Sequence, residues 1–488
     1  MRVETLPPVI SSLQPSNHPY LNGAWTPLLE EVNAFDLEVT QGVIPSDIDG
    51  VYLRNTENQV QQPLGTFHPF DGDGMIHQIE FKAGKANYRN RFVRTRGFEA
   101  EQEAAASLWG GLADPVQLAK RRGWGAHGWL KDSSSTDIVV HAGQALSTFY
   151  QCGEGYRLDP LTLDQGGLAP WVPIDGISAH PKLDEATGEL LFFNYSKIPP
   201  YLHFGVVGAD NKLKSYRPVP LPGPRLPHDM AFTEHFAILN DLPVFWDEKL
   251  LERDIHAVRL HEGLKSRFAI VPRHGDGEIR WFEADPTYVL HWLNAYEDGD
   301  EIVLDGYFQE DPMPPPRADA PKGYEHMMAY LDEFSFKPKL HRWRFNLKTG
   351  QTKEGHLDDR IMEFGMINGR YGGRKYRYGY STASVPGWFL FRGFIKSDLE
   401  TGTSTEFMLP DGVYASEAPF APKIGGVDED DGYLVSFLTD ENTGRSECIL
   451  IDAKAIEAGP ICRIALPHKL CSGTHACWAD RAQLTPAS

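Results

Sequence analysis

Short β-rich runs alternate with turn signals over most of the chain, and this alternation limits its fold more than any other feature. The runs are rich in Val, Ile, Leu, Phe, Tyr and Trp and read as strands or hairpins, at 190–197, 235–241, 301–308, 341–355, 388–402, 432–453 and 461–467. Turn dipeptides lie among them, Asp-Gly at 49, 71, 73, 175, 305 and 411 and Thr-Gly at 187, 349, 401 and 443. This rhythm predicts an all-β fold, a propeller or a large barrel, rather than an α/β fold.

The chain has 488 residues, and closed β architectures of this length can form one domain. We therefore expect residues 1–488 to form a single domain. Segment 99–122 departs from the rhythm, because its Ala-rich sequence predicts a helix, interrupted at Gly110-Gly111 and Pro115. We interpret it as a helical cap with loops over one face, and ordinary packing against a neighbouring strand is the alternative. The proline-rich segment 311–323 predicts a loop.

The formal net charge is −20, which argues against nucleic-acid binding and against electrostatic docking on anionic lipid. Five cysteines in no repeating pattern, and without a Cys-x-x-Cys pair, argue against a disulfide framework and a cysteine zinc site. The first residues lack the apolar core of a signal peptide, and no apolar run reaches the length of a membrane span. These features predict a soluble, cytoplasmic protein.

Four of the 18 histidines share a local context. His180, His228 and His291 each precede a predicted strand or hairpin, with spacings of 48 and 63 residues that are close to one propeller blade. Residues that enter the axial channel of a propeller from successive blades can converge on one point, and His475 could join them from the last blade. Imidazole nitrogen suits iron, copper or zinc, so the four histidines are candidate ligands of a metal whose identity the spacing leaves open.

Several blocks of sequence, in order, resemble the carotenoid cleavage oxygenase family, which also includes the lignostilbene dioxygenases and isoeugenol monooxygenases. The resemblance covers nearly the whole chain. Each block is weak alone, but together they are specific. They are Gly-Val-Ile-Pro-Ser-Asp-Ile-Asp-Gly-Val-Tyr-Leu-Arg-Asn from 42, Phe-Asp-Gly-Asp-Gly-Met-Ile-His from 70, Leu-Asp-Pro-Leu-Thr-Leu from 158, Ser-Ala-His-Pro-Lys from 178, His-Asp-Met-Ala-Phe from 228 and Glu-Ala-Pro-Phe-Ala-Pro-Lys from 417.

The resemblance implies a seven-bladed β-propeller with Fe(II) on its axis, held by the four histidines, and no organic cofactor. It implies that the enzyme uses O2 to cleave a carbon–carbon double bond of a hydrophobic alkene into two carbonyl products. It also implies carboxylates that accept the outer N–H of ligand imidazoles, and Glu363 and Glu417 match two of the family's three. At the place of the third, the chain has Gln151, which can still accept a ring N–H but carries no charge.

Two further departures concern the substrate. Family members that cleave phenolic stilbenes or isoeugenol tend to have Lys where this chain has Tyr150, and Tyr where it has Phe98. An apolar polyene such as an apocarotenoid is therefore the favoured substrate, and a phenolic stilbene or phenylpropanoid is the alternative. We expect Phe98, Tyr150, Phe308 and Trp109 to line the substrate tunnel. A lipophilic substrate also suggests peripheral membrane contact through an apolar patch near Trp109 or 242–246.

Two other classes of protein remain open from the residues alone. A hydrolytic propeller would hold Ca²⁺ or Zn²⁺, but calcium prefers oxygen ligands and the candidate set is imidazole. The Asp71-Gly-Asp-Gly run resembles part of a calcium loop and is interpreted as a tight turn. A non-catalytic binding propeller is the other class, and the retention of four histidines and two glutamates in matching contexts argues against it. The oligomeric state is not predicted.

Overall fold

The structure is a computed structural model that describes residues 1–123, 125, 130–253 and 255–485. The chain separates into two compact units, and each is described by itself. Unit 1 comprises Met1–Ala179, Arg392–Phe394 and Thr405–Ser488, and unit 2 comprises His180–Phe391 and Ile395–Ser404. Both consist mainly of antiparallel sheet, which confirms the predicted all-β class.

The described residues of unit 1 form two sheets and contribute strands to a third. The first has the order β1(Arg2–Thr5)-β2(Val32–Phe35)-β7(Lys85–Phe92)-β6(Asp73–Lys82)-β4(Gly50–Arg54)-β34(Ala476–Asp480), and β5(Glu57–Asn58) also pairs with β6. The second is the meander β8(Asp137–His141)-β9(Gln144–Thr148)-β10(Tyr156–Leu158)-β11(Gln165–Leu168). In the third, β29(Val413–Ala415) and β30(Phe420–Pro422) pair with β31(Gly432–Asp440), followed by β32(Arg445–Asp452), β33(Pro460–Ala465) and β3(Val39–Gly42).

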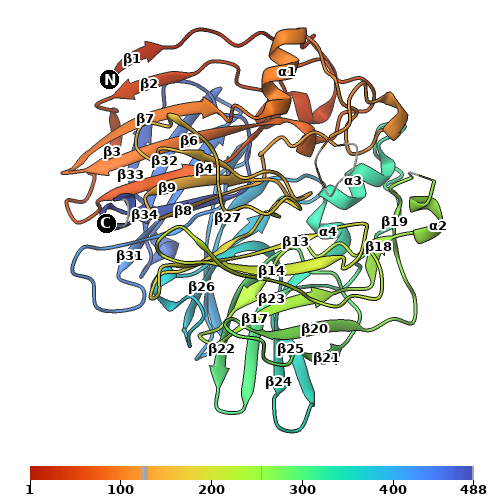
Figure 1. Cartoon of the computed structure of the whole chain (residues 1–488). Helices are drawn as coiled ribbons and strands as arrows, with labels where there is room; N and C mark the ends of the chain where they lie inside the picture. The colour runs from red at the N-terminus through yellow and green to blue at the C-terminus, as the bar shows by residue number, and fades with distance from the viewer. Residues whose placement is uncertain (124, 126–129, 254, 486–488) are drawn as a thin grey trace. The chain divides into compact units, whose positions relative to one another are not determined.

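Segments far apart in the sequence are thus neighbours in unit 1. The late strand β34 pairs with β4 in the register Ala476↔Arg54 to Asp480↔Gly50, and β33 pairs with the early strand β3. In Figure 1 the red β3 accordingly lies beside the blue β33.

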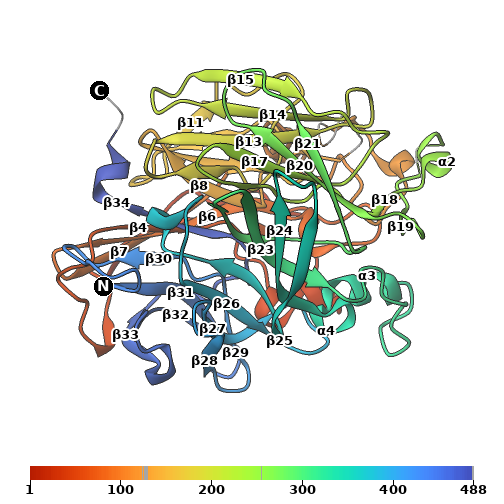
Figure 2. The same ribbon diagram turned by 90° about the horizontal axis from the view of Figure 1, so that it is seen from below.

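Unit 2 is built from meanders that follow one another along the chain (Figure 2). They are β12(Lys182–Asp184)-β13(Glu189–Tyr195)-β14(Leu202–Val207)-β15(Leu213–Pro218), β16(Ala231–Phe232)-β17(Phe236–Asp241)-β20(Ser266–Pro272)-β21(Arg280–Ala284), and β22(Trp292–Asp298)-β23(Glu301–Gln309)-β24(Pro338–Asn346)-β25(Thr352–Met366)-β26(Tyr378–Ser384). A two-stranded ribbon pairs β18(Val244–Trp246) with β19(Val258–Leu260), and β27(Phe391–Asp398) and β28(Thr403–Met408) contain residues of both units.

The predicted Thr-Gly turns are confirmed. Gly188 and Gly350 have φ of 70° and 74°, the left-handed backbone that glycine adopts without strain, and they join β12 to β13 and β24 to β25. Asp305-Gly306, predicted as a turn, instead lies inside β23. The reason is packing across the sheet: Gly306 is paired with Trp292, and a Cβ on Gly306 would approach the Trp292 ring to 2.5 Å.

The predicted helical cap is shorter than expected. Helix α1 spans Arg96–Ala104 and ends at Ala105, whose φ is 50°. From Ala105 to Arg122 the only regular element is a single 3-10 turn at Val116–Leu118. In this stretch a side-chain carboxylate accepts a hydrogen bond from a backbone N–H that would be paired within a helix: Asp71 accepts from Leu112 N at 2.7 Å. The predicted loop at 311–323 has no regular element.

The remaining helices are short. They are α2(Glu248–Leu251), α3(Glu325–Leu331) and α4(Glu333–Phe336), with 3-10 turns at Pro19–Leu21, Gly23–Trp25, Pro69–Asp71, Gly369–Tyr371, Ile456–Ala458 and Arg481–Leu484. Among the described residues, none of the helices combines the length and the apolar character needed to cross a bilayer.

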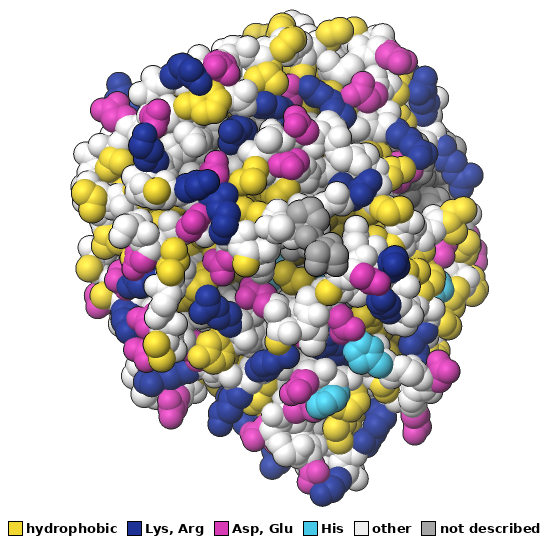
Figure 3. Space-filling view, turned by 60° about the vertical axis from the view of Figure 1, so that its left-hand side comes forward, with side chains coloured by type: hydrophobic (Ala, Val, Ile, Leu, Met, Phe, Trp, Pro, Cys, Tyr) yellow, Lys and Arg dark blue, Asp and Glu magenta, His cyan; other side chains and the backbone are white. Residues whose placement is uncertain are grey.

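Each unit has its own apolar core. Trp292 and Trp343 pack with Phe268 and Phe345 between the sheets of unit 2, while Phe81, Tyr52 and Phe437 belong to the core of unit 1. Figure 3 shows basic and acidic side chains interspersed on the face that it presents, with hydrophobic side chains singly or in small groups. Trp109 and the Leu242–Trp246 segment, expected at an exposed apolar patch, are buried.

Candidate metal centre

Three of the four predicted histidines meet in unit 2. Candidate ligand nitrogens of His180, His228 and His291 all lie within 4.8 Å of one another, and the ring centroids are 4.9 to 5.2 Å apart. Nε2 of His180 is 3.3 Å from Nε2 of His228. These three residues are called the histidine trio below.

The local chain explains why the trio converges. His180 lies two residues before β12, His228 three before β16 and His291 one before β22, so each stands at the entrance to the first strand of a meander. His180 has a φ of 64°, which lies in the left-handed region. For a residue other than glycine this conformation costs about 1–3 kcal/mol of conformational free energy. Such strain persists only where the surrounding contacts hold it in place.

The trio fits a transition-metal ion by its donor chemistry. Two nitrogens that each lie about 2.1 Å from one metal ion are roughly 3.0–3.4 Å apart, and the His180–His228 separation of 3.3 Å falls in that range. His180 and His291 are buried and His228 is partly buried, so the nitrogens are largely shielded from bulk water. Neutral imidazoles suit iron, copper and zinc.

Glu363 holds the outer nitrogen of one ligand ring. Its Oε2 lies 2.6 Å from His291 Nδ1 and also accepts from Phe364 N at 2.7 Å. With the carboxylate ionised, Nδ1 donates and Nε2 of His291 keeps the lone pair that a metal needs. Burial, followed by the charge of Glu333, raises the pKa of Glu363 well above its usual range. A nearby cation would favour the ionised form.

His475 belongs to unit 1 and stands directly before β34. Its Nδ1 lies 3.4 Å from Glu417 Oε2, which also accepts from Ala476 N at 2.7 Å. Burial lowers the pKa of His475, but the charge of Glu417 and the hydrogen bond to it outweigh burial and raise the pKa. The pairs His475–Glu417 and His291–Glu363 therefore share one arrangement, a histidine at the entrance to a strand with a buried glutamate on its Nδ1 side.

Gln151 is buried in unit 1, beyond the end of β9. It hydrogen-bonds the side chain of Tyr150, whose pKa is raised by burial and by the charge of Asp71. A role of Gln151 beside a metal ligand stays a prediction.

The four residues predicted to contact substrate have different surroundings. Tyr150 and Trp109 line a pocket of unit 1 that holds about 500 Å³ of empty space, part of it open to solvent. Phe98 instead stacks on Phe92, with ring centroids 5.3 Å apart, in a core cluster. Phe308, in unit 2, stacks on His341 at 4.9 Å. The structure thus brings Tyr150 and Trp109 to one pocket and gives the two phenylalanines packing contacts.

Sequence reasoning missed the charged residues of this pocket. Lys131 lines it, and its Nζ lies 2.8 Å from both Asp73 and Glu101. Burial raises the pKa of Asp73 to about 6, although Lys131 opposes the shift. Asp73 lies in the Phe-Asp-Gly-Asp-Gly block that carried the resemblance, so the signal was present but was interpreted only as a turn.

Comparison with known proteins places the chain in a family. Residues 25–480 match the family described as "RPE65: Retinal pigment epithelial membrane protein". A carotenoid 9,10(9',10')-cleavage dioxygenase 1 of Pisum sativum is 32% identical over 96% of this chain and 91% of its own length.

Solved structures agree with this assignment. The lignostilbene dioxygenase of Pseudomonas brassicacearum superposes with a TM-score of 0.84 and 27% identity, over 96% of this chain and 100% of that one. A cobalt-substituted Synechocystis ACO gives 0.81 and 26%, over 94% and 98%. The predicted family and the predicted enzyme class are both confirmed: the chain is an oxidoreductase that incorporates O2, and it belongs to the RPE65/carotenoid cleavage oxygenase family.

Proposed function

We propose that the protein is an Fe(II)-dependent dioxygenase that cleaves a carbon–carbon double bond of an apolar alkene into two carbonyl products, with an apocarotenoid-like polyene as the favoured substrate. The observation that carries the proposal is the histidine trio, which supplies converging imidazoles in a chain similar over 96% of its length to a carotenoid cleavage dioxygenase.

The trio would hold the iron, and His475 is the fourth ligand that the family resemblance implies. Iron supplies the redox chemistry by which O2 reacts with an alkene. The protein's own task is to fix the imidazoles and to exclude water. Glu363 keeps a proton on His291 Nδ1 when it is ionised, and Glu417 stands at the corresponding nitrogen of His475. The residues thus act on the metal's ligands and need not exchange protons with the substrate.

The proposed architecture is a seven-bladed propeller with the iron on its axis. Its support is the repeated meander that begins within three residues after each histidine of the trio, together with the TM-score of 0.84 to a lignostilbene dioxygenase. The pairing of β34 with β4 joins late and early strands in one sheet, as closure of a propeller requires.

A phenolic stilbene is the second candidate substrate. Two observations favour it: the superposition on the lignostilbene dioxygenase, and the charged group Lys131–Glu101 in the lining of a pocket that Tyr150 also lines. Against it stand Tyr150 and Phe98 at the places where phenol-cleaving relatives tend to have Lys and Tyr. An apolar polyene would use the aromatic walls, whereas a phenol would use the charged group.

The test is reconstitution of the purified protein with Fe(II), followed by O2 uptake and product analysis with an apocarotenal and with a 4-hydroxystilbene. We expect about one iron per chain and two carbonyl products from the apocarotenal. If only the stilbene is cleaved, the substrate is a phenolic stilbene rather than an apolar polyene. Absence of iron binding, or iron without turnover of either compound, would overturn the proposed function.

A further inference from the structure

Asp229 is a fully buried carboxylate that follows His228 directly in the chain. Its Oδ1 lies 2.7 Å from Lys182 Nζ and accepts from Met230 N at 2.7 Å. Its Oδ2 accepts from Trp292 N at 2.9 Å. Both oxygens therefore have partners, and all of these partners lie in unit 2.

The partners of Asp229 are adjacent to the whole trio. Lys182 is two residues after His180, and Trp292 is the residue after His291. Asp229 itself is the residue after His228, and its carbonyl accepts from Asn240 Nδ2 at 2.8 Å, which ties this segment to β17. One side chain thus joins three chain segments, and each segment carries one histidine.

We propose that Asp229 is a positioning residue that sets the spacing of His180, His228 and His291 by holding their three backbone segments together. The inference rests on the proposed function, because it assumes that the trio binds the metal. It assigns Asp229 a role distinct from that of Glu363, which fixes the rotation of one ring through its Nδ1.

The physical argument is that the contacts of Asp229 join these segments at a point that the strand ladders do not reach. The three histidines stand before the strands, so ladder hydrogen bonds of β12, β16 and β22 begin only after them. His180 also has a left-handed backbone, which needs support from its surroundings. The Lys182–Asp229 ion pair supplies that support two residues after His180. Because the Asp229 carboxylate is fully buried, water does not compete with Lys182 for it. A small misplacement of donor atoms is enough to weaken a metal site.

Asp305 offers a matched control. It is also fully buried in unit 2, and its oxygens accept from Arg342 Nε and Nη2 at 2.8 Å each, while Oδ2 also accepts from the Tyr376 hydroxyl at 2.7 Å. Neither partner is near a trio histidine in the sequence. Asp305→Asn therefore disrupts a buried ionic network of a similar kind but leaves the contacts of Asp229 with Lys182 and Trp292 in place.

The experiment measures metal affinity rather than turnover. Full-length wild type, Asp229→Asn, Lys182→Met and Asp305→Asn are stripped of metal, and Co²⁺ binding is followed by chelator competition and by the visible spectrum, with thermal unfolding of each. We expect 10–100-fold weaker binding and an altered spectrum for Asp229→Asn, the range seen when groups that orient ligands are removed. Lys182→Met should show the same changes to a smaller degree, and Asp305→Asn should lower stability with unchanged affinity and spectrum.

Three results would overturn the inference. One is a folded Asp229→Asn protein with the Co²⁺ affinity and spectrum of wild type. If Asp229→Asn does not fold, a folded Lys182→Met protein with wild-type affinity and spectrum would overturn the inference instead. Another is an equal loss of Co²⁺ affinity in Asp229→Asn and Asp305→Asn, which would mean that the loss follows from lower stability of the fold and not from the position of Asp229. The third is a wild-type protein that binds neither Co²⁺ nor Fe²⁺, and only this result would overturn the proposed function as well.

Discussion

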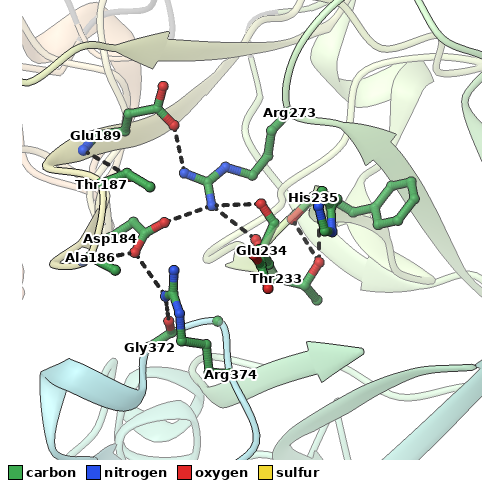
Figure 4. A network of polar contacts seen from close by, with 12 residues as sticks. Asp184, Ala186, Thr187, Glu189, Thr233, Glu234, His235, Arg273, Gly372 and Arg374 are labelled. Atoms are coloured by element: carbon green, nitrogen blue, oxygen red, sulfur yellow. Dashed lines mark hydrogen bonds and ion pairs between the residues drawn. The ribbon is translucent and has the colours of Figure 1, made fainter. Parts of the chain in front are cut away.

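The two ends of strand β12 are fastened by different ionic arrangements. At the end near His180, Lys182 pairs with Asp229 at 2.7 Å. At the other end, Asp184 pairs with Arg273 and with Arg374 at 2.9 Å each, and Arg273 also reaches Glu189 at 2.7 Å (Figure 4). Both aspartates are fully buried, so the difference lies in their partners rather than in their exposure.

The charges differ accordingly. At the Arg273 end, two arginines face two carboxylates, and although burial raises the pKa of Asp184, hydrogen bonds from Arg374 and Arg273 outweigh burial and lower it. At the histidine end, burial raises the pKa of Asp229 in spite of Lys182, and Glu363 is raised in the same way. At the first end two arginines pair with two carboxylates, and at the second Lys182 pairs with Asp229. The comparison separates an ion-pair network that stabilises the fold from a contact that joins chain segments carrying the trio.

The largest expected effect is at the histidine end. His228→Ala removes one imidazole of the trio, so we expect loss of both bound iron and O2-dependent turnover, measured by metal analysis and product formation. His235→Ala is the control, because His235 is an exposed histidine of unit 2 that pairs with Glu297. Full iron content and activity in His228→Ala would remove this residue from the ligand set.

Asp184→Asn tests the other end. It removes one of the two carboxylates that pair with Arg273, which is 1% exposed, and leaves Glu189 as the other. An unpaired buried charge costs about 3–5 kcal/mol of unfolding free energy, so with Glu189 still in place we expect a loss near or below the lower end of that range. Urea unfolding at neutral pH measures this loss, and Co²⁺ affinity of the folded variant should equal that of wild type. A variant that loses the metal but keeps its stability would reverse the two assignments.

The same pair predicts a pH dependence. The pKa of Asp184 is lower in the folded protein than its unfolded value of about 3.9, so its contribution is fully present above that pH and is lost as pH falls through the folded pKa. The difference in unfolding free energy between wild type and Asp184→Asn should therefore shrink in acid. A difference that stays constant as pH falls from about 4 through the folded pKa of Asp184 would contradict the assignment.

Glu363→Gln tests the ring partner of His291. The amide keeps the size but removes the charge at 2.6 Å from Nδ1, so we expect 10–100-fold weaker metal binding with little change in folding. Chelator competition measures the affinity, and circular dichroism checks the fold. Unchanged affinity would show that the charge of Glu363 is not needed to orient His291.

The smallest expected effect is that of Gln151→Glu. It introduces the carboxylate that the family resemblance implies at this place, and we expect iron retention to rise several-fold with the fold intact. Iron content after dialysis against a chelator is the measurement. No change in retention would mean that Gln151 does not act on a metal ligand.

The sequence was sufficient for features that depend on local chemistry or on motif order. Gly188 and Gly350 close hairpins because Thr-Gly favours such turns, and the convergence of the trio was predicted because each histidine precedes a predicted strand or hairpin. Gly306 was interpreted wrongly as a turn because its role depends on Trp292, a residue of the neighbouring strand.

The junction at Asp229 could not be predicted for a related reason. It depends on the side chain of Lys182 and the amide of Trp292, which are brought together by the placement of three separate sheets. No sequence pattern reports a hydrogen bond to a backbone amide 63 residues away. The ring contacts of Phe98 and Phe308 likewise come from the structure, since an aromatic residue of the sequence can as readily pack in a core as line a tunnel.

The pairing of β34 with β4 has a consequence for biosynthesis. The two strands join residues as far apart as Gly50 and Asp480, so at about 5–20 residues per second a ribosome needs about 20–90 s between making the first and the second. During that time β4 lacks its neighbour and is an open sheet edge, the kind of surface that recruits other chains. The nascent chain therefore has a long interval in which this edge can pair with other chains, and the strand that ends the interval is the one that follows His475.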